Sequence, residues 1–246
     1  MYKNFSKVYD KFMEICDYNE WVKLLEKYKL DFCPDGKNFL DLGCGTGSTL
    51  VILSEKYKCS GLDLSEEMLK RANIKLKGKN VPLFLGDMRE FSTGEKYDII
   101  FSFFDTVNHL SNTQNLLDLF NSVGNSLNEE GIYVFDVVDR EFMDKMFAND
   151  IYADSRKDFA VVWEHFYNEE ENLDEIEASY FVKNKNKTYD RYNEYYEKRI
   201  FTHEEICFCC EKAGLQIKIT ELNDQIAGKR YFYVLKKYRC KKIVLK

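Results

Sequence analysis

The sequence predicts an α/β fold, in which a mostly parallel, Rossmann-like sheet is covered by helices on both faces and carries a small antiparallel insertion. Three observations lead to this prediction. Apolar strand patterns alternate with helical patterns over about residues 36–138, as in βαβ units. A glycine-rich turn directly follows the first of these strands. From about residue 139 to 200 the pattern becomes aromatic and alternates with a period of two, which is typical of antiparallel strands.

The glycine-rich turn is the most informative segment. Two helices are expected over about residues 5–30, and the first strand then runs into residues 39–47, which read FLDLGCGTG. Glycine lacks a Cβ, so a turn with glycines at 43, 45 and 47 can adopt positive φ and let a ligand approach the backbone closely. The run 48–57 is predicted to be a helix whose N-terminal N–H groups face the same ligand. These features predict a site for a nucleoside-containing cofactor.

The spacing of the glycines separates two kinds of cofactor. A dinucleotide fingerprint reads G-x-G-x-x-G, whereas here the third glycine comes one position early and Ser48 stands where the last glycine would be. Asp41 also precedes the first glycine by two residues. A glycine-rich turn alone is weak evidence, so the neighbouring segments have to decide between the two kinds of cofactor.

Acidic residues follow the next strands in order. Asp63 lies at the end of the predicted strand 58–62, where a carboxylate can accept both ribose hydroxyl hydrogens. Ser65 is predicted to cap the helix that follows. After a third short strand, 81–85, comes Asp87, and a fourth, apolar strand at 97–102 leads to Phe103 and Phe104. Each acid alone is also explained as a strand-end turn residue, but their order at successive βα turns favours a cofactor site.

The pattern of Asp41, the three glycines, Asp63 and Asp87 resembles that of the class I S-adenosylmethionine-dependent methyltransferases. The resemblance implies a seven-stranded sheet whose last strand is antiparallel, here supplied by the closing strands 215–220 and 229–235. It also implies S-adenosyl-L-methionine as the cofactor, with an acid near position 87 reading the adenine amino group. The residues that the resemblance assigns to the cofactor are Asp41, Gly43, Cys44, Gly45, Gly47, Asp63, Leu64, Met68, Asp87, Met88 and Phe104.

The insertion narrows the choice of acceptor. After a helix at 112–127 and a fifth strand at 131–137, the alternation breaks, so we divide the chain into a cofactor-binding domain (1–138 and 201–246) and an inserted β lid (139–200). An insertion after the fifth strand emerges at the carboxyl edge of the sheet, where ligands of open α/β sheets bind. This layout resembles small-molecule N-methyltransferases, such as the glycine N-methyltransferase group and those of nucleotide-linked amino sugars. Neither an Asn/Asp-Pro-Pro-Tyr segment nor a Pro-Cys pair, which would mark nucleic-acid methylation, occurs in the sequence.

Three histidines supply candidates for a general base. His109 follows the fourth strand in the loop expected to border both cofactor and acceptor, and imidazole titrates near neutral pH. A capping or packing role is its alternative. Tyr9 is a second candidate, because the resemblance places the Tyr9-Asp10 pair near the cofactor. His165 lies in the insertion, where it either lines the acceptor cavity or is packed under the lid, and His203 opens a helix.

Composition excludes several other classes of protein. The 246 residues carry a net charge of −6, which disfavours nucleic acid, although the segment 236–246 is locally basic. No apolar run reaches the 18 residues of a membrane span. The eight cysteines follow no disulfide framework and are expected to be free thiols in a cytoplasmic enzyme. Cys207 and Cys210 have a C-x-x-C spacing, but no further pair completes a zinc site, so we expect core packing and no metal.

The sequence therefore predicts a monomeric or weakly dimeric enzyme that transfers a methyl group from S-adenosyl-L-methionine to an amine or hydroxyl of a small molecule. Two alternatives remain open. The same core would serve an RNA- or protein-modifying methyltransferase, for which the basic segment at the C-terminus would supply the contact. A non-catalytic protein that keeps only the cofactor fold would also carry these motifs. The sequence does not identify the acceptor.

Overall fold

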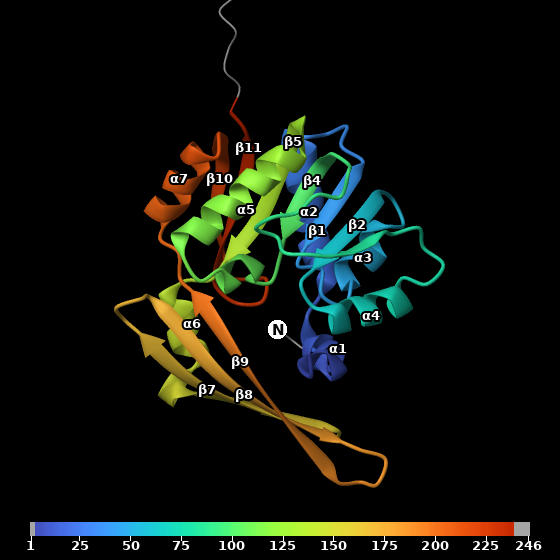
Figure 1. Ribbon diagram of the computed structural model, residues 1–246, viewed down its shortest axis with the longest axis vertical. Helices are drawn as coiled ribbons and strands as arrows, with labels where there is room; N and C mark the ends of the chain where they lie inside the picture. The colour runs from blue at the N-terminus through green and yellow to red at the C-terminus, as the bar shows by residue number, and fades with distance from the viewer. Residues whose placement is uncertain (1–2, 239–246) are drawn as a thin grey trace, which may run out of the picture.

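The computed structural model describes residues 3–238 and contains a seven-stranded sheet beside a smaller antiparallel sheet (Figure 1). The strands of the larger sheet are β1 (Asn38–Leu42), β2 (Lys58–Asp63), β3 (Leu83–Leu85), β4 (Tyr97–Ser102), β5 (Leu127–Val137), β10 (Leu215–Asn223) and β11 (Arg230–Lys237). Their order is β10-β11-β5-β4-β1-β2-β3. The pairs among β1 to β5 are parallel, whereas β11 runs antiparallel to both β5 and β10. This confirms the predicted sheet with its antiparallel last strand.

Helices cover both faces of this sheet. The helices α2 (Tyr18–Phe32), α3 (Ser48–Leu53) and α4 (Glu66–Lys75) pack on one face, and α5 (Thr113–Ser126) and α7 (His203–Lys212) pack on the other (Figure 1). Successive residues of β5 alternate between these layers: Ile132 and Val134 point to the α2 side, and Tyr133 and Phe135 to the α5 side. Burial of both faces explains why the central strands are apolar almost throughout.

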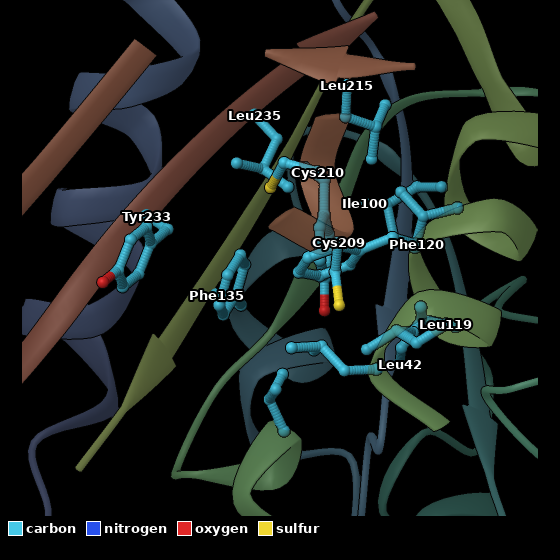
Figure 2. Packing of buried hydrophobic residues seen from close by; sticks show 14 of the residues in the cluster. Leu42, Ile100, Leu119, Phe120, Phe135, Cys209, Cys210, Leu215, Tyr233 and Leu235 are labelled. Carbon is cyan, nitrogen blue, oxygen red and sulfur yellow. The ribbon is translucent and has the colours of Figure 1, made fainter. Parts of the chain in front are cut away.

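Two of the cysteines on α7 belong to the core. Cys209 and Cys210 are buried on the inner side of α7 and lie among apolar side chains from the sheet and α5 (Figure 2). The seven cysteines within residues 3–238 are free thiols, and that part of the chain holds no His/Cys/Asp/Glu cluster fit for a metal ion. Core packing therefore holds for Cys210 of the C-x-x-C pair, whereas Cys207 is half-buried, with Sγ 3.4 Å from His203 Nε2.

The smaller sheet is formed by the segment between β5 and α7. Its strands are β6 (Ile151–Ser155), β7 (Phe159–Asn168), β8 (Leu173–Lys183) and β9 (Tyr189–Arg199), antiparallel and in sequence order. The aromatic segments predicted as strands are β7 and β9. The first part of the segment is helical instead, because Asp139 caps α6 (Arg140–Met146) by accepting a hydrogen bond from the Phe142 N–H at 2.9 Å. A 3-10 turn, η4 (Ala148–Asp150), connects α6 to β6.

Some predicted elements differ in length. The helix predicted over 48–57 ends at Leu53, and residues 54–57 turn into β2. β5 begins at Leu127, earlier than predicted, and a register irregularity against β4 lies between Tyr97 and Ile99. The first of the two predicted N-terminal helices is three short pieces, η1 (Phe5–Lys7), α1 (Tyr9–Phe12) and η2 (Met13–Ile15). We refer to residues 5–15 as the N-terminal arm.

The N-terminal arm joins the two sheets. Phe5 stacks on Tyr180 of β8 with ring centroids 4.8 Å apart, and Phe12 lies 5.4 Å from Trp163 of β7. These residues belong to a third apolar cluster, which includes Val138 and Met143 after β5. α1 thus lies between α4 and the smaller sheet (Figure 1). The smaller sheet is fixed to the rest of the molecule partly through the arm.

The end of the described chain carries little free positive charge. Lys236 and Lys237 lie 3.5 Å and 3.4 Å from the carboxylates of Glu130 and Glu129. The basic segment predicted as a possible RNA contact lies, beyond Tyr238, outside the described residues. Within residues 3–238, no helix is long and apolar enough to cross a membrane.

Candidate cofactor and active site

The glycine turn after β1 has a left-handed backbone at each of its glycines, with φ of 83° at Gly43, 53° at Gly45 and 76° at Gly47. A Cβ added at Gly43 would lie 2.4 Å from Thr106 Cγ2, so glycine is needed beside that side chain. A Cβ added at Gly45 would meet no protein atom within 4 Å. Gly45 therefore borders open space, in which a ligand can approach the backbone.

This space is a cavity of about 290 Å³ at the carboxyl ends of the parallel strands. The predicted site residues that line it are Tyr9, Asp41, Gly43, Cys44, Gly45, Asp63, Leu64, Met68, Asp87, Met88, Phe104 and His109. The chain brings these residues together because parallel strands end at the same edge of a sheet.

Gly47 was predicted with the others but does not line the cavity. It is the N-cap of α3, and a Cβ there would lie 3.1 Å from Leu76 Cδ1 and 3.3 Å from Ala72 Cβ. The absence of a side chain at this position therefore allows α3 to pack closely against the end of α4. Glycine is therefore needed at position 47 for helix packing.

Other cavity-lining residues were missed by sequence reasoning. They include Tyr18, Thr46, Ser48, Arg89, Ser111 and Asn115. Thr46 and Ser48 stand within or next to the glycine turn, so the motif itself was a signal for them. Arg89 follows Asp87 by two residues, and its guanidinium binds that carboxylate through Nε at 3.0 Å and Nη2 at 2.5 Å. This pairing holds the pKa of Asp87 below its usual range.

The buried Asp41 and the half-buried Asp63 lie near each other at the ends of β1 and β2. Asp63 accepts hydrogen bonds from the Gly45 N–H at 2.8 Å and the Ser65 N–H at 2.7 Å. Burial raises the pKa of Asp63, and burial together with the charge of Asp63 raises that of Asp41. Each oxygen of Asp63 has further lone-pair capacity, so the carboxylate can still accept from ligand hydroxyls.

A strained turn follows β4. Phe104 and Asp105 both have left-handed backbone, with φ of 61° and 52°. The Phe104 ring lies 4.1 Å from that of Trp21, centroid to centroid. The Asp105 N–H donates to Asp136 Oδ2 at 2.9 Å, and its carboxylate forms an ion pair with Lys198 of β9. Contacts from β5 and from the smaller sheet therefore hold a conformation that these two side chains would not adopt alone.

His109 ends the 3-10 turn η3 (Thr106–His109) and lines the cavity. Its Nδ1 lies 3.3 Å from the carbonyl oxygen of Glu197 in β9, which favours the tautomer with the proton on Nδ1 and the lone pair on Nε2. Burial, followed by the nearby charge of Lys198, lowers the pKa of His109 to about 4. The imidazole is therefore neutral at pH 7.

Tyr9 lies in the same cavity and comes from the N-terminal arm. Burial is the main cause that raises the pKa of its hydroxyl well above 10, and the charge of Asp105 adds to it. The phenol is therefore protonated at neutral pH. The site thus combines a neutral imidazole and a neutral phenol next to a turn built for close approach of a ligand.

Comparison with known proteins identifies the family of this site. A model of the methyltransferase domain matches residues 39–131. The chain is 32% identical over 245 residues to the Bacillus subtilis protein YqeM, which carries the name of a methyltransferase, with 96% of this chain and 97% of YqeM covered. The chain belongs to the S-adenosylmethionine-dependent methyltransferases. It is a methyltransferase whose cofactor is S-adenosyl-L-methionine.

Two further relatives of this methyltransferase extend the comparison. A solved S-adenosylmethionine-dependent methyltransferase from Clostridium acetobutylicum superposes with a TM-score of 0.85 at 25% identity, covering 97% of this chain and 99% of that one. The dTDP-3-amino-3,4,6-trideoxy-alpha-D-glucopyranose N,N-dimethyltransferase of Streptomyces venezuelae is 34% identical over 102 residues, which cover 41% of this chain and 42% of that enzyme.

The residues present fit the cofactor of this family. The open space beside Gly45 provides close access to the backbone, and Asp63 and Asp87 provide acceptors for hydroxyl and amino groups. Leu64, Met68 and Met88 provide apolar surface between those acids.

The other two histidines of the methyltransferase do not line the cavity. His165 is buried under the smaller sheet, with Nε2 at 2.5 Å from Asp174 Oδ1 and its ring stacked on Phe147 at 4.5 Å. His203 lies on α7, with Nδ1 at 3.0 Å from the Tyr233 hydroxyl. Of the two alternatives for His165, the structure therefore favours packing, because the side chain is buried and does not line the cavity.

Proposed function

We propose that this methyltransferase transfers the methyl group of S-adenosyl-L-methionine to an amine, or a hydroxyl, of a small-molecule acceptor. The observation that carries the proposal is that Tyr9 and His109 open into the same cavity as Gly45, from the side of the smaller sheet. The similarity to a sugar N,N-dimethyltransferase supports an amine acceptor. A nucleotide-linked amino sugar is the first class of acceptor to test.

The cofactor roles follow from the chemistry of each side chain. We assign the ribose hydroxyls to Asp63, whose carboxylate is held by the N–H groups of Gly45 and Ser65. Asp87 accepts from the adenine amino group, and Leu64 and Met88 pack on the adenine ring. Asp41, Gly43 and Cys44 form the floor of the turn under the cofactor, and Met68 and Phe104 close its apolar sides.

The protein has to orient the acceptor and manage one proton. When bound, the cofactor would supply a methyl group activated on a sulfonium: a lone pair of the acceptor, in line with the S–C bond, would attack the methyl carbon, and S-adenosylhomocysteine would leave with the bonding electrons on sulfur. An aliphatic ammonium has a pKa of about 10 and has no lone pair until it loses a proton. The acceptor would first lose a proton to water, and His109 Nε2, neutral at pH 7 because its pKa is lowered to about 4, can then accept a hydrogen bond from the N–H of the amine and hold its lone pair in line with the S–C bond. Tyr9 is the alternative polar group and orients the acceptor through its hydroxyl.

We further propose that residues 139–200 form a lid domain on the cofactor-binding domain of residues 1–138 and 201–246. Two contacts support the role of a lid, because they join β9 to residues at the site: Lys198 pairs with Asp105, and the Glu197 carbonyl lies beside His109. The free thiols support work in a reducing cytoplasm. A monomer or weak homodimer is sufficient, because one chain supplies all the proposed site residues.

The proposal is tested with purified enzyme, S-adenosyl-L-methionine and a panel of amines, hydroxyl compounds and nucleotide-linked amino sugars, with S-adenosylhomocysteine formation as the readout. We expect acceptor-dependent product formation from at least one amine. Gly45→Arg, which fills the space beside the turn, is the control and should abolish both binding of S-adenosylhomocysteine and turnover. Tight cofactor binding without transfer to any member of the panel would favour a non-catalytic binding protein.

A further inference from the structure

An ammonium group from α4 links three separate segments at the edge of the cavity. Lys75 Nζ donates hydrogen bonds to Thr46 Oγ1 at 2.9 Å, to Ser48 Oγ at 2.7 Å and to Asp10 Oδ1 at 2.8 Å. The Thr46 hydroxyl in turn donates to Asp10 Oδ1 at 2.5 Å. We call these four residues the Lys75 cluster. An ammonium has three donors, and here each has an oxygen partner.

The three partners of Lys75 belong to different parts of the site. Thr46 lies in the glycine turn, Ser48 begins α3, and Asp10 belongs to the N-terminal arm. Thr46 and Ser48 line the cavity, and so does Tyr9, the neighbour of Asp10. Lys75 therefore sets the positions of two cavity hydroxyls directly, and that of a cavity phenol through the arm.

We propose that Lys75 is a positioning residue for cofactor binding, which acts by fixing Thr46 and Ser48 and by holding the N-terminal arm closed against the glycine turn. The inference rests on the proposed cofactor site. It adds to that site a residue outside the glycine motif.

The charge distribution explains why a cation is needed here. Asp41 and Asp63 line the cavity, and Asp10 lies at its edge through its contact with Thr46. Burial is the main cause that raises the pKa of the Tyr18 hydroxyl, and the nearby charges of Asp10 and Asp41 add to it. The Lys75 side chain is 27% exposed and that of Asp10 is 47% exposed, so water screens their pair only in part. Without Lys75, Asp10 keeps the Thr46 hydroxyl as a partner but loses its ion pair, and the arm is held less firmly to the turn.

The other side of the arm is held independently. Phe5 and Phe12 pack on Tyr180 and Trp163 of the smaller sheet. Loss of Lys75 therefore weakens the attachment of the arm to the glycine turn and leaves its packing on the smaller sheet intact. The Lys75 cluster is therefore the polar contact by which the arm is held against the glycine turn.

The matched control is Lys70, on the same helix. Lys70 forms ion pairs with Glu67 at 2.8 Å and Glu66 at 3.1 Å, both within α4. Lys75→Met and Lys70→Met thus remove the same charge from α4, and only the first removes the contacts with the cavity hydroxyls. Lys75→Arg keeps the charge and a donor set, and is the rescue variant.

The test measures binding of S-adenosylhomocysteine by calorimetry, and hydrogen–deuterium exchange of residues 5–15. We expect Kd to rise about tenfold in Lys75→Met, to stay within about twofold in Lys70→Met, and to recover in part in Lys75→Arg. Exchange of the arm should be faster in Lys75→Met only. Asp10→Asn should also weaken binding, and the effects of the two changes should be less than additive in the double variant, because both remove the ion pair between Lys75 and Asp10.

Two outcomes would overturn the inference. One is a Kd for Lys75→Met within about twofold of the wild type, and the other is equal weakening in Lys70→Met, which would assign the effect to the charge of α4. If Lys75→Met does not fold, the comparison is made with Asp10→Asn, for which unchanged binding is equally decisive. Gly45→Arg separates this result from the cofactor site itself, because unchanged binding in that variant would mean that the site lies elsewhere.

Discussion

Replacement of Gly45 by alanine tests whether the glycine turn is shaped by a ligand. The added Cβ would meet no protein atom within 4 Å, so it would not clash with the folded protein. The backbone at Gly45 is left-handed, with φ of 53°, and a non-glycine residue in that conformation costs about 1 kcal/mol. Gly45→Ala should therefore lower the free energy of unfolding by about that amount.

Gly78 provides a matched control. It also has a left-handed backbone, with φ of 85°, and a Cβ there would also meet nothing within 4 Å, but it lies in an exposed turn after α4 and does not line the cavity. Gly78→Ala should therefore destabilise the protein to a similar extent. Only in Gly45→Ala does the new methyl group project toward the proposed cofactor, where overpacking costs about 1–3 kcal/mol.

That cost corresponds to a Kd for S-adenosylhomocysteine that is about 5- to 150-fold higher in Gly45→Ala than in the wild type. Calorimetry measures the Kd, and urea unfolding of the unliganded proteins measures the stability. The reasoning is refuted if Gly45→Ala binds as tightly as the wild type, or if Gly78→Ala weakens binding to the same degree. The first result would mean that the cofactor does not bind beside Gly45. The second would mean that lower stability, and not contact with the cofactor, weakens binding.

Three further predictions concern the loop that faces the turn. Gly43→Ala places a Cβ 2.4 Å from Thr106 Cγ2 and should lower the free energy of unfolding by about 2–4 kcal/mol. In urea unfolding, the added change Thr106→Ser should recover part of this loss, because it removes Cγ2. No recovery would mean that the cost comes from the backbone conformation alone. His109→Ala should lower turnover about 100-fold with little change in the Kd of S-adenosylhomocysteine, whereas unchanged turnover would transfer the catalytic role to Tyr9 or to positioning alone. Because burial lowers the pKa of His109 from 6.5 to about 4, the folded state resists its protonation, so its contribution to stability is complete above pH 6.5 and declines by about 3 kcal/mol as the pH falls to 4. Asp136, whose pKa is raised to about 6, acts in the opposite sense over part of this range, so the measurement is the difference between wild type and His109→Asn at each pH, and a difference that is flat from pH 7 to 4 would contradict the assignment.

The strands of the larger sheet and most of the cavity could be predicted from the sequence because their signals are local. The turn after β1 and the acids after β2 and β3 each lie within a few residues of a strand end, and the parallel sheet brings those ends together. The sequence could not show that Gly47 serves packing, because its neighbours Ala72 and Leu76 come from the next helix.

Contacts between residues far apart in the sequence likewise could not be predicted. The ion pair of Asp105 with Lys198 joins residues 93 positions apart, and it holds a strained turn that no local pattern marks. The packing of Phe5 and Phe12 on the smaller sheet also depends on the tertiary arrangement. Helix α6 was missed because the Asp139 cap stands at the beginning of a segment otherwise rich in strand residues.

The central claim, that the acceptor is a small molecule, is tested most directly by following the methyl group. Cell extract is incubated with the enzyme and methyl-labelled S-adenosyl-L-methionine, with Gly45→Arg as the inactive control, and the label is measured in the small-molecule, RNA and protein fractions. We predict label in the small-molecule fraction, on a nitrogen, that depends on the wild-type enzyme. Enzyme-dependent label confined to RNA or protein would contradict the account.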